Sequence, residues 1–166
     1  MNQLEIVTHT LEPVYNKHSK ILILGTIPSP KSREVGFYYS HVQNRFWKIM
    51  AALFNEDLPQ TNEEKKKMML DHHIALWDVL KQCRIKGADD NSISQVEVND
   101  INYLLKQTEI EKIYTTGLKA TQLYKKHCFK DTGIASIYLP STSPANCRHY
   151  NLELLIEEYR CIFESL

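Results

Sequence analysis

The sequence predicts an α/β fold with three layers, α/β/α, and a central four-stranded parallel sheet. Four short runs are apolar along most of their length, as expected for buried strands, and they cover residues 20–25, 74–78, 112–117 and 135–140. The segments between them place apolar residues three and four positions apart, which is typical of helices packed along one side. Buried strands that alternate with helices indicate a parallel sheet covered on both faces.

The strands follow one another at regular intervals along the chain. Residues 20–25 (KILILG) form a continuous apolar run closed by glycine, the pattern of a buried strand. Residues 74–78 (IALWD), 112–117 (KIYTTG) and 135–140 (ASIYLP) repeat this pattern. Predicted helices lie between these strands and after the last one, so strands and helices alternate along the chain.

The helices are predicted from apolar spacing and from capping residues. Two segments, 61–64 (TNEE) and 94–97 (SQVE), have the form of a capping box, in which Ser or Thr is followed three residues later by Glu. The expected helices are an amphipathic one on Phe46, Ile49, Met50 and Leu53, a charged one from 61 through 67, one after residue 97 that carries Ile101, Leu104 and Leu105, one over 118–127, and one on Leu152, Leu155, Ile156 and Tyr159.

The length and composition indicate one intracellular domain. A chain of 166 residues without an internal repeat is expected to form a single domain over residues 1–166 with a substantial core. No apolar run is long enough to predict a membrane span, and the first residues lack the pattern of a secretory signal. The four cysteines form no CxxC pair, which favours reduced thiols. The 20 basic and 20 acidic residues balance, so net charge alone does not indicate nucleic acid.

Unusual local sequences follow the predicted strands. They are residues 25–32 (GTIPSPKS), 77–78 (WD), 116–117 (TG) and 139–146 (LPSTSPAN). The carboxyl ends of parallel strands meet at one edge of a sheet, and ligands bind there. The sequence therefore predicts a site at this edge.

Residues 25–32 come close to the phosphate-binding pattern GxxxxGK[ST]. Lys31 and Ser32 occupy its last two positions, and Asp78 could serve as the matching metal-binding aspartate. Pro30 occupies the second glycine position, however, and Pro28 lies within the loop. Proline has no N–H and cannot adopt a positive φ, so a phosphate cradle is not expected. A stiff turn without a ligand is the simpler alternative.

Residues 36–47 (GFYYSHVQNRFW) combine aromatic rings with polar side chains. Aromatic rings can stack on a planar base, and Asn or His can contact its edge or position a water molecule. The structural alternatives are that Asn44 caps the following helix and that Phe46 and Trp47 belong to the core. Residues 139–146 suit a rigid loop close to a phosphate backbone, although such Ser/Pro loops are also common as plain turns.

No metal site is expected. His72 and His73 are adjacent, so on a helix they point in different directions, and Cys147 and His149 supply only two ligands. Nucleophile motifs of recognisable form are absent as well.

Taken together, these segments resemble the uracil-DNA glycosylase superfamily. Residues 38–47 (YYSHVQNRFW) are similar to the F/Y-A-H-P-x-N-R-F-W signature of its mismatch-specific uracil glycosylase branch. Residues 25–29 resemble the G-x-x-P-[GS] loop after the first strand, and residues 140–146 resemble the Pro-Ser loop after the last one. Residues 74–79, followed by Cys83 and 90–93, are similar to the hypoxanthine-DNA glycosylase branch. The likeness extends from residue 21 to residue 146.

The resemblance also implies which residue is catalytic. In the uracil-specific branches the first loop carries an Asp or Asn that positions the attacking water, whereas here Ile27 stands at that place. The hypoxanthine branch lacks that residue too, and the Asn of its N-x-F-W segment is the proposed catalytic group. This implies Asn44 as the catalytic residue, and Asn44→Ala is expected to lose most turnover. Val42 replaces the usual Pro of the signature.

The other site residues implied by the resemblance form a base pocket and a DNA-binding surface. The pocket is expected to comprise Gly25, Thr26, Ile27, Pro28, Ser29, Tyr39 and Phe46, with Tyr39 stacked on the base. The DNA-binding residues are expected to be Lys31, Ser32, Arg45, Ser141, Thr142, Ser143, Asn146 and Arg148. No metal and no cofactor is implied.

The implied function is that of a monofunctional DNA glycosylase of base excision repair. It would flip a deaminated base, with hypoxanthine favoured, out of double-stranded DNA and hydrolyse its N-glycosidic bond. The alternatives are a mismatch-specific uracil or thymine glycosylase, a non-catalytic DNA- or nucleotide-binding module, and a metal-dependent nucleoside-phosphate hydrolase. A monomer suffices for this chemistry, and the expected location is cytoplasmic and bacterial-type, associated with the nucleoid during action, with no membrane partner.

Overall fold

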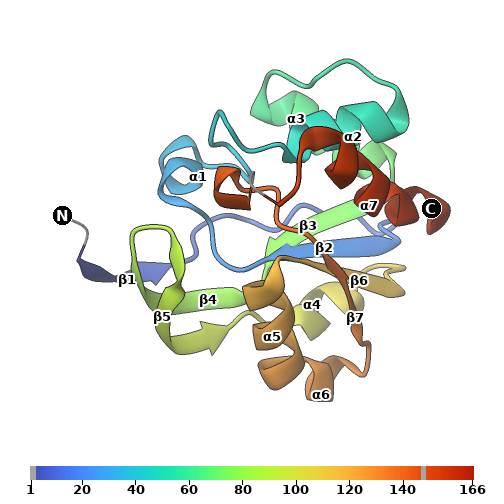
Figure 1. Cartoon of the computed structure of the whole chain (residues 1–166). Helices are drawn as coiled ribbons and strands as arrows, with labels where there is room; N and C mark the ends of the chain where they lie inside the picture. The colour runs from blue at the N-terminus through green and yellow to red at the C-terminus, as the bar shows by residue number, and fades with distance from the viewer. Residues whose placement is uncertain (1–2, 147–148) are drawn as a thin grey trace.

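A four-stranded parallel sheet forms the centre of the molecule (Figure 1). The computed structural model describes residues 3–146 and 149–166. The strands are β2 (Ile21–Gly25), β3 (Ile74–Asp78), β6 (Lys112–Thr116) and β7 (Ser136–Leu139), in the order β3-β2-β6-β7. All neighbouring pairs in this sheet are parallel, with Ile21 opposite both Ile74 and Lys112. The predicted strands and fold class are confirmed.

Helices cover both faces of this sheet, as predicted (Figure 1). One face is covered by α2 (Phe46–Phe54), α3 (Asn62–Asp71) and α7 (Leu152–Glu164), and the other by α4 (Ile101–Leu105) and α5 (Leu118–His127), with the short α6 (Phe129–Thr132) after α5. Alternate residues of β2 serve the two faces: Ile21 and Ile23 pack with α2 and α7, whereas Leu22 and Leu24 pack with α5. None of the described helices is long and apolar enough to cross a membrane.

A second, antiparallel sheet was not predicted. It consists of β1 (Leu4–Thr8), β4 (Leu80–Lys86) and β5 (Asp89–Val98) in the order β1-β4-β5. The expected capping box at residues 94–97 was wrong, because this segment lies within β5, where Ser94 pairs with Arg84. The helix that follows begins only at Ile101, with Asp100 as its N-cap. Long-range strand pairing therefore overrides the local capping pattern here.

The other capping box, at residues 61–64, is confirmed. Thr61 precedes α3, and its hydroxyl accepts a hydrogen bond from the Glu64 N–H at 3.1 Å. The Glu64 carboxylate reaches back to the backbone N–H of Gln60 at 3.1 Å. Together these bonds satisfy backbone donors that the first turn of a helix leaves without partners.

Candidate active site

A pocket opens at the carboxyl edge of the parallel sheet, where the sequence predicts a site. Its volume is about 680 Å³, within the range of pockets that hold a small planar ligand. It lies among the loop after β2, the ends of β3 and β6, the segment 38–44, the loop 141–145 and the tip of the β4–β5 hairpin. Six chain segments thus meet around one cavity.

The loop after β2 forms one side of this pocket. All five residues predicted for it, Gly25, Thr26, Ile27, Pro28 and Ser29, line the cavity. The loop is anchored to the strand beside it, because the N–H groups of Val79 and Leu80 donate to the carbonyls of Gly25 and Thr26 at 2.8 and 3.0 Å.

The loop then turns directly into the short helix α1 (Pro30–Val35). The Ser29 hydroxyl accepts a hydrogen bond from the Ser32 N–H at 3.2 Å and caps this helix, whose first residue is Pro30. Proline is well suited to a first helical position, where its missing N–H is not needed. The prolines thus stiffen the pocket edge and leave no phosphate cradle, as the sequence indicates.

Asn44 lines the pocket from the turn before α2. Its side-chain Oδ1 accepts two hydrogen bonds, from the Phe46 N–H at 2.9 Å and from the Thr142 hydroxyl at 2.8 Å. The N-cap of α2 is Arg45, without a side-chain capping bond, so Asn44 is not the cap; it lies one residue earlier and binds the first N–H of the helix. These bonds occupy only the oxygen, and Nδ2 forms no hydrogen bond with the described residues. Its N–H groups are free for a ligand while the oxygen fixes their direction.

Tyr39 forms an aromatic wall of the pocket. Its backbone has φ 53°, in the left-handed region that non-glycine residues rarely adopt. Such backbone strain is concentrated at functional sites. Burial and the neighbouring Asp78 carboxylate raise the pKa of the Tyr39 phenol, which therefore stays protonated.

Phe46 does not line the pocket, in contrast to the sequence-based expectation. It is fully buried and stacks behind Tyr39, with ring centroids 4.0 Å apart and an angle of 12° between the planes. Phe46 therefore supports the tyrosine ring from the core side. The neighbouring Trp47 is also a core residue, and its indole N–H donates to the Tyr38 carbonyl at 3.1 Å.

Arg45 fixes the loop after β7 instead of facing outward. Its guanidinium donates to the carbonyls of Ser143, at 3.0 Å, and of Tyr150. The backbone N–H of Arg45 donates to the Thr142 carbonyl at 3.1 Å. These bonds direct the Arg45 guanidinium into the loop. Ser32 lines the pocket but is only 3% exposed, and its hydroxyl accepts a hydrogen bond from the Ser40 N–H.

The remaining predicted DNA-binding residues lie around the pocket opening or support it. Lys31, Ser141 and Ser143 line the cavity, and the exposed Lys31 ammonium lies 3.7 Å from Glu34. Thr142 is buried and holds Asn44, whereas the Asn146 amide donates to the Ser141 carbonyl at 3.0 Å within its own loop. Arg148 lies outside the described residues.

Residues 77–78 and 116–117 were expected at this edge of the sheet, but Asp78 and Thr116 were not assigned to the base pocket, and the other residues named below were not expected there. Asp78 lines the pocket at the end of β3, where His9 contacts it, and Thr116 lines it at the end of β6. The tip of the β4–β5 hairpin adds Ile85, Gly87, Ala88 and Asp90. The position of Asp78 at a strand end was a usable signal. No sequence pattern indicated the hairpin or His9 as part of the site, because the antiparallel sheet that positions them was not predicted.

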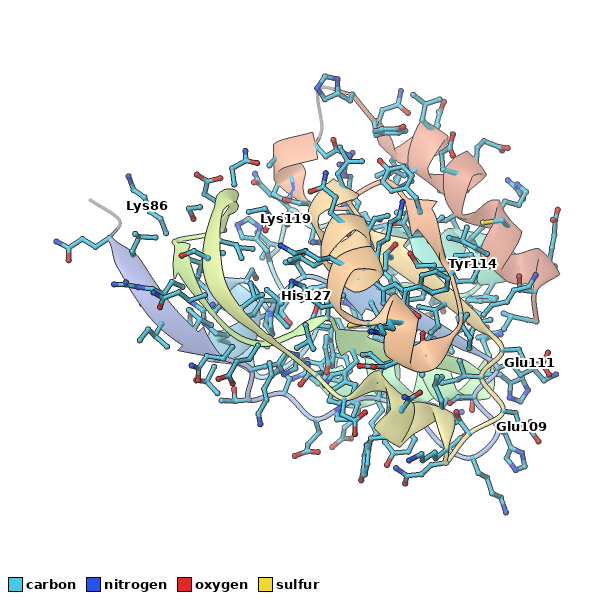
Figure 2. The ribbon with its side chains drawn as sticks, turned by 90° about the horizontal axis from the view of Figure 1, so that it is seen from below. Lys86, Glu109, Glu111, Tyr114, Lys119 and His127 are labelled. Atoms are coloured by element: carbon cyan, nitrogen blue, oxygen red, sulfur yellow. The ribbon has the colours of Figure 1, made fainter. Side chains whose placement is uncertain are left out.

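Two lysines lie at the pocket end of the molecule, where the pocket lining also contains the acidic residues Glu34, Asp78 and Asp90. Figure 2 shows Lys86, in the β4–β5 hairpin, and Lys119, in the first turn of α5, away from Glu109 and Glu111. The two glutamates precede β6 and therefore lie at the amino edge of the sheet, opposite the pocket. A net charge of zero thus conceals an arrangement that places these lysines near the pocket and these carboxylates far from it.

The fold and the site together define a class of protein: an α/β protein with a ligand-sized pocket at the carboxyl edge of its parallel sheet. The model of the uracil DNA glycosylase superfamily matches residues 12–164. The chain belongs to this superfamily. It is a DNA glycosylase, a hydrolase of N-glycosyl bonds that acts on DNA.

Two relatives and one solved structure are similar over most of the chain. The hypoxanthine DNA glycosylase of Methanosarcina acetivorans is 34% identical over 137 residues, which cover 81% of this chain and 85% of the relative. That of Methanosarcina barkeri is 31% identical over 137 residues, with 82% and 86% covered. The solution NMR structure of a proposed uracil DNA glycosylase from Methanosarcina acetivorans has a TM-score of 0.79 and 28% identity, covering 96% of this chain and 99% of that one.

Proposed function

We propose that this protein is a monofunctional glycosylase of base excision repair that flips hypoxanthine out of double-stranded DNA and hydrolyses its bond to the sugar. The observation that carries the proposal is the Asn44 amide at the pocket, whose oxygen is held by two hydrogen bonds and whose NH₂ group is free. The relatives named hypoxanthine DNA glycosylases support hypoxanthine as the base.

The chemistry requires stabilisation of a separating pair of charges. As the glycosidic bond breaks, the sugar gains oxocarbenium character and the departing base gains negative charge. An amide is neither a base nor a nucleophile, so Asn44 acts by orientation and by its dipole. Its Nδ2–H groups donate to the departing base, on which the negative charge develops, and because their direction is fixed beforehand, no reorganisation is needed during the reaction.

The flipped base is held between the Tyr39 wall and the loop after β2. The ring of Tyr39 supplies a rigid stacking surface, because Phe46 packs directly behind it. Residues 25–29 also line the pocket. Lys31 and the hydroxyls of Ser141 and Ser143 lie at the pocket and contact the flanking strand.

Removal of uracil is the second candidate, since the structural relative is a proposed uracil DNA glycosylase. Ile27 lines the pocket in the loop after β2, and its aliphatic side chain cannot position a water molecule. Hypoxanthine is therefore favoured over uracil. We further propose that the protein acts as a monomer in the cytoplasm, at the nucleoid.

A single-turnover assay with excess protein tests this proposal. End-labelled duplexes that contain deoxyinosine, deoxyuridine or a G·T mismatch are incubated, treated with alkali and separated by length. We expect cleavage of the deoxyinosine duplex to be fastest. Faster cleavage of the deoxyuridine or mismatch duplex would show that uracil or mismatched thymine, and not hypoxanthine, is the preferred base. Folded protein that cleaves none of the three would overturn the proposed function.

A further inference from the structure

A buried pair of ionisable side chains, His9 and Asp78, lies at the pocket. His9 Nε2 and Asp78 Oδ2 are 2.8 Å apart, and the two side chains are only 2% and 6% exposed. A carboxylate oxygen only accepts hydrogen bonds, so Nε2 of His9 is the donor. Buried ionisable groups are costly unless they are paired, and they occur frequently at functional sites. The catalytic role proposed for Asn44 makes no use of this pair.

The second sheet brings His9 to this place. His9 directly follows β1, and its backbone N–H donates to the Lys81 carbonyl of β4 at 2.7 Å. Asp78 lies at the end of β3, in the central sheet. The contact therefore joins the two sheets at the pocket, and the N-terminal strand supplies a component of the site.

The other carboxylate oxygen of Asp78 remains available. No hydrogen bond to Oδ1 is formed among the described residues, and Asp78 lines the pocket. Oδ1 lies directly over Gly25, where an added Cβ atom would be only 2.5 Å from it. The absence of a side chain at Gly25 thus lets the carboxylate reach the pocket. His9, which binds Oδ2, sets the rotation that leaves Oδ1 facing the ligand.

We propose that His9 is a positioning residue and that Asp78 Oδ1 accepts a hydrogen bond from the ring N–H of the flipped base. This inference rests on the proposed function. Hypoxanthine carries a proton on N1 beside its C6 oxygen, whereas adenine has an unprotonated N1 with a lone pair. A fixed oxygen that only accepts attracts the N1–H of hypoxanthine and repels the N1 lone pair of adenine. The pair therefore selects a deaminated purine over the normal base from which it arises.

The test pairs enzyme variants with a base that lacks the ring N–H. Deoxynebularine, a purine deoxynucleoside without the C6 oxygen and the N1 proton, is placed in the same duplex as deoxyinosine. Comparing the ratio of the two single-turnover rates between variants removes the difference in intrinsic reactivity. The variants are Asp78→Asn, His9→Leu, His9→Gln and, as an exposed control, Asp71→Asn. Binding to a duplex with an abasic-site analogue is measured alongside.

We expect Asp78→Asn to slow deoxyinosine cleavage by about a hundredfold and deoxynebularine cleavage far less. His9→Leu is expected to slow deoxyinosine cleavage by about tenfold, and His9→Gln, which keeps a donor, by less. Binding to the abasic duplex, which presents no base, should be retained by Asp78→Asn and unchanged in the control. If Asp78→Asn slows cleavage of deoxyinosine and deoxynebularine equally, the role of Asp78 in recognising the base is wrong, while the proposed function stands. Wild-type protein that is inactive on deoxyinosine would overturn the proposed function and this inference with it.

Discussion

At the scale of single residues, the site depends on small groups held by many contacts. Asn44, Thr142 and the Phe46 N–H form one hydrogen-bonded unit across the two loops. The sequence indicates Asn44 through a resemblance and the pocket loop through its place after a strand. It cannot show that Ser32 faces inward, because that depends on Ser40, eight residues later in the chain. Phe46 likewise could be assigned to the pocket or to the core until its distance from Tyr39 was known.

Substitution of Gly25 tests the close packing of Asp78 against the start of the loop after β2. A methyl group at Gly25 would be 2.5 Å from Asp78 Oδ1, so the carboxylate must move away. We expect Gly25→Ala to lose about 1–3 kcal/mol of unfolding free energy, as overpacked sites do. Deoxyinosine cleavage should fall as well. Urea unfolding followed by circular dichroism measures the first effect, and unchanged stability together with unchanged cleavage would refute the close approach of Asp78 to Gly25.

At the scale of elements, the loop after β7 is shaped by the start of α2. Arg45 binds carbonyls on both sides of this loop, and the Tyr159 hydroxyl of α7 binds the Pro140 carbonyl at 2.5 Å. Local sequence predicts a rigid loop from its prolines but not the partner that fixes it. Arginine beside an expected DNA surface suggests a phosphate contact, and only the three-dimensional structure shows that backbone carbonyls occupy its guanidinium instead.

Arg45→Met therefore serves as a test of the loop. The aliphatic part of the side chain is retained, while the hydrogen bonds to Ser143 and Tyr150 are lost. Hydrogen bonds to charged groups contribute about 1.5–3 kcal/mol each, so we expect a clear loss of stability. Hydrogen exchange in residues 140–146 should also accelerate. A purely phosphate-binding arginine would instead change the salt dependence of DNA binding and leave exchange in the loop unaltered, as expected for the exposed Lys31→Met.

At the scale of the whole molecule, the parallel sheet was predictable and the antiparallel one was not. The strands of the central sheet are buried on both faces, so continuous apolar runs such as residues 21–24 mark them. In contrast, β5 is mostly exposed and polar, and its pairing with β4 is interrupted by register shifts. Such a strand has no apolar alternation to reveal it. His9 directly follows a strand of this sheet, and the β4–β5 hairpin forms one wall of the pocket. These parts of the site therefore could not be predicted either.

The central claim is that the free NH₂ group of Asn44 drives base excision in this pocket. The most direct measurement is the single-turnover cleavage of a deoxyinosine duplex by Asn44→Asp, compared with the wild type and with Asn62→Asp, a control at an exposed residue of α3. Aspartate keeps both oxygen contacts, to Phe46 and Thr142, but cannot donate from the second position. We predict a loss of about a hundredfold or more with an intact fold. Cleavage by Asn44→Asp at the wild-type rate would contradict the account.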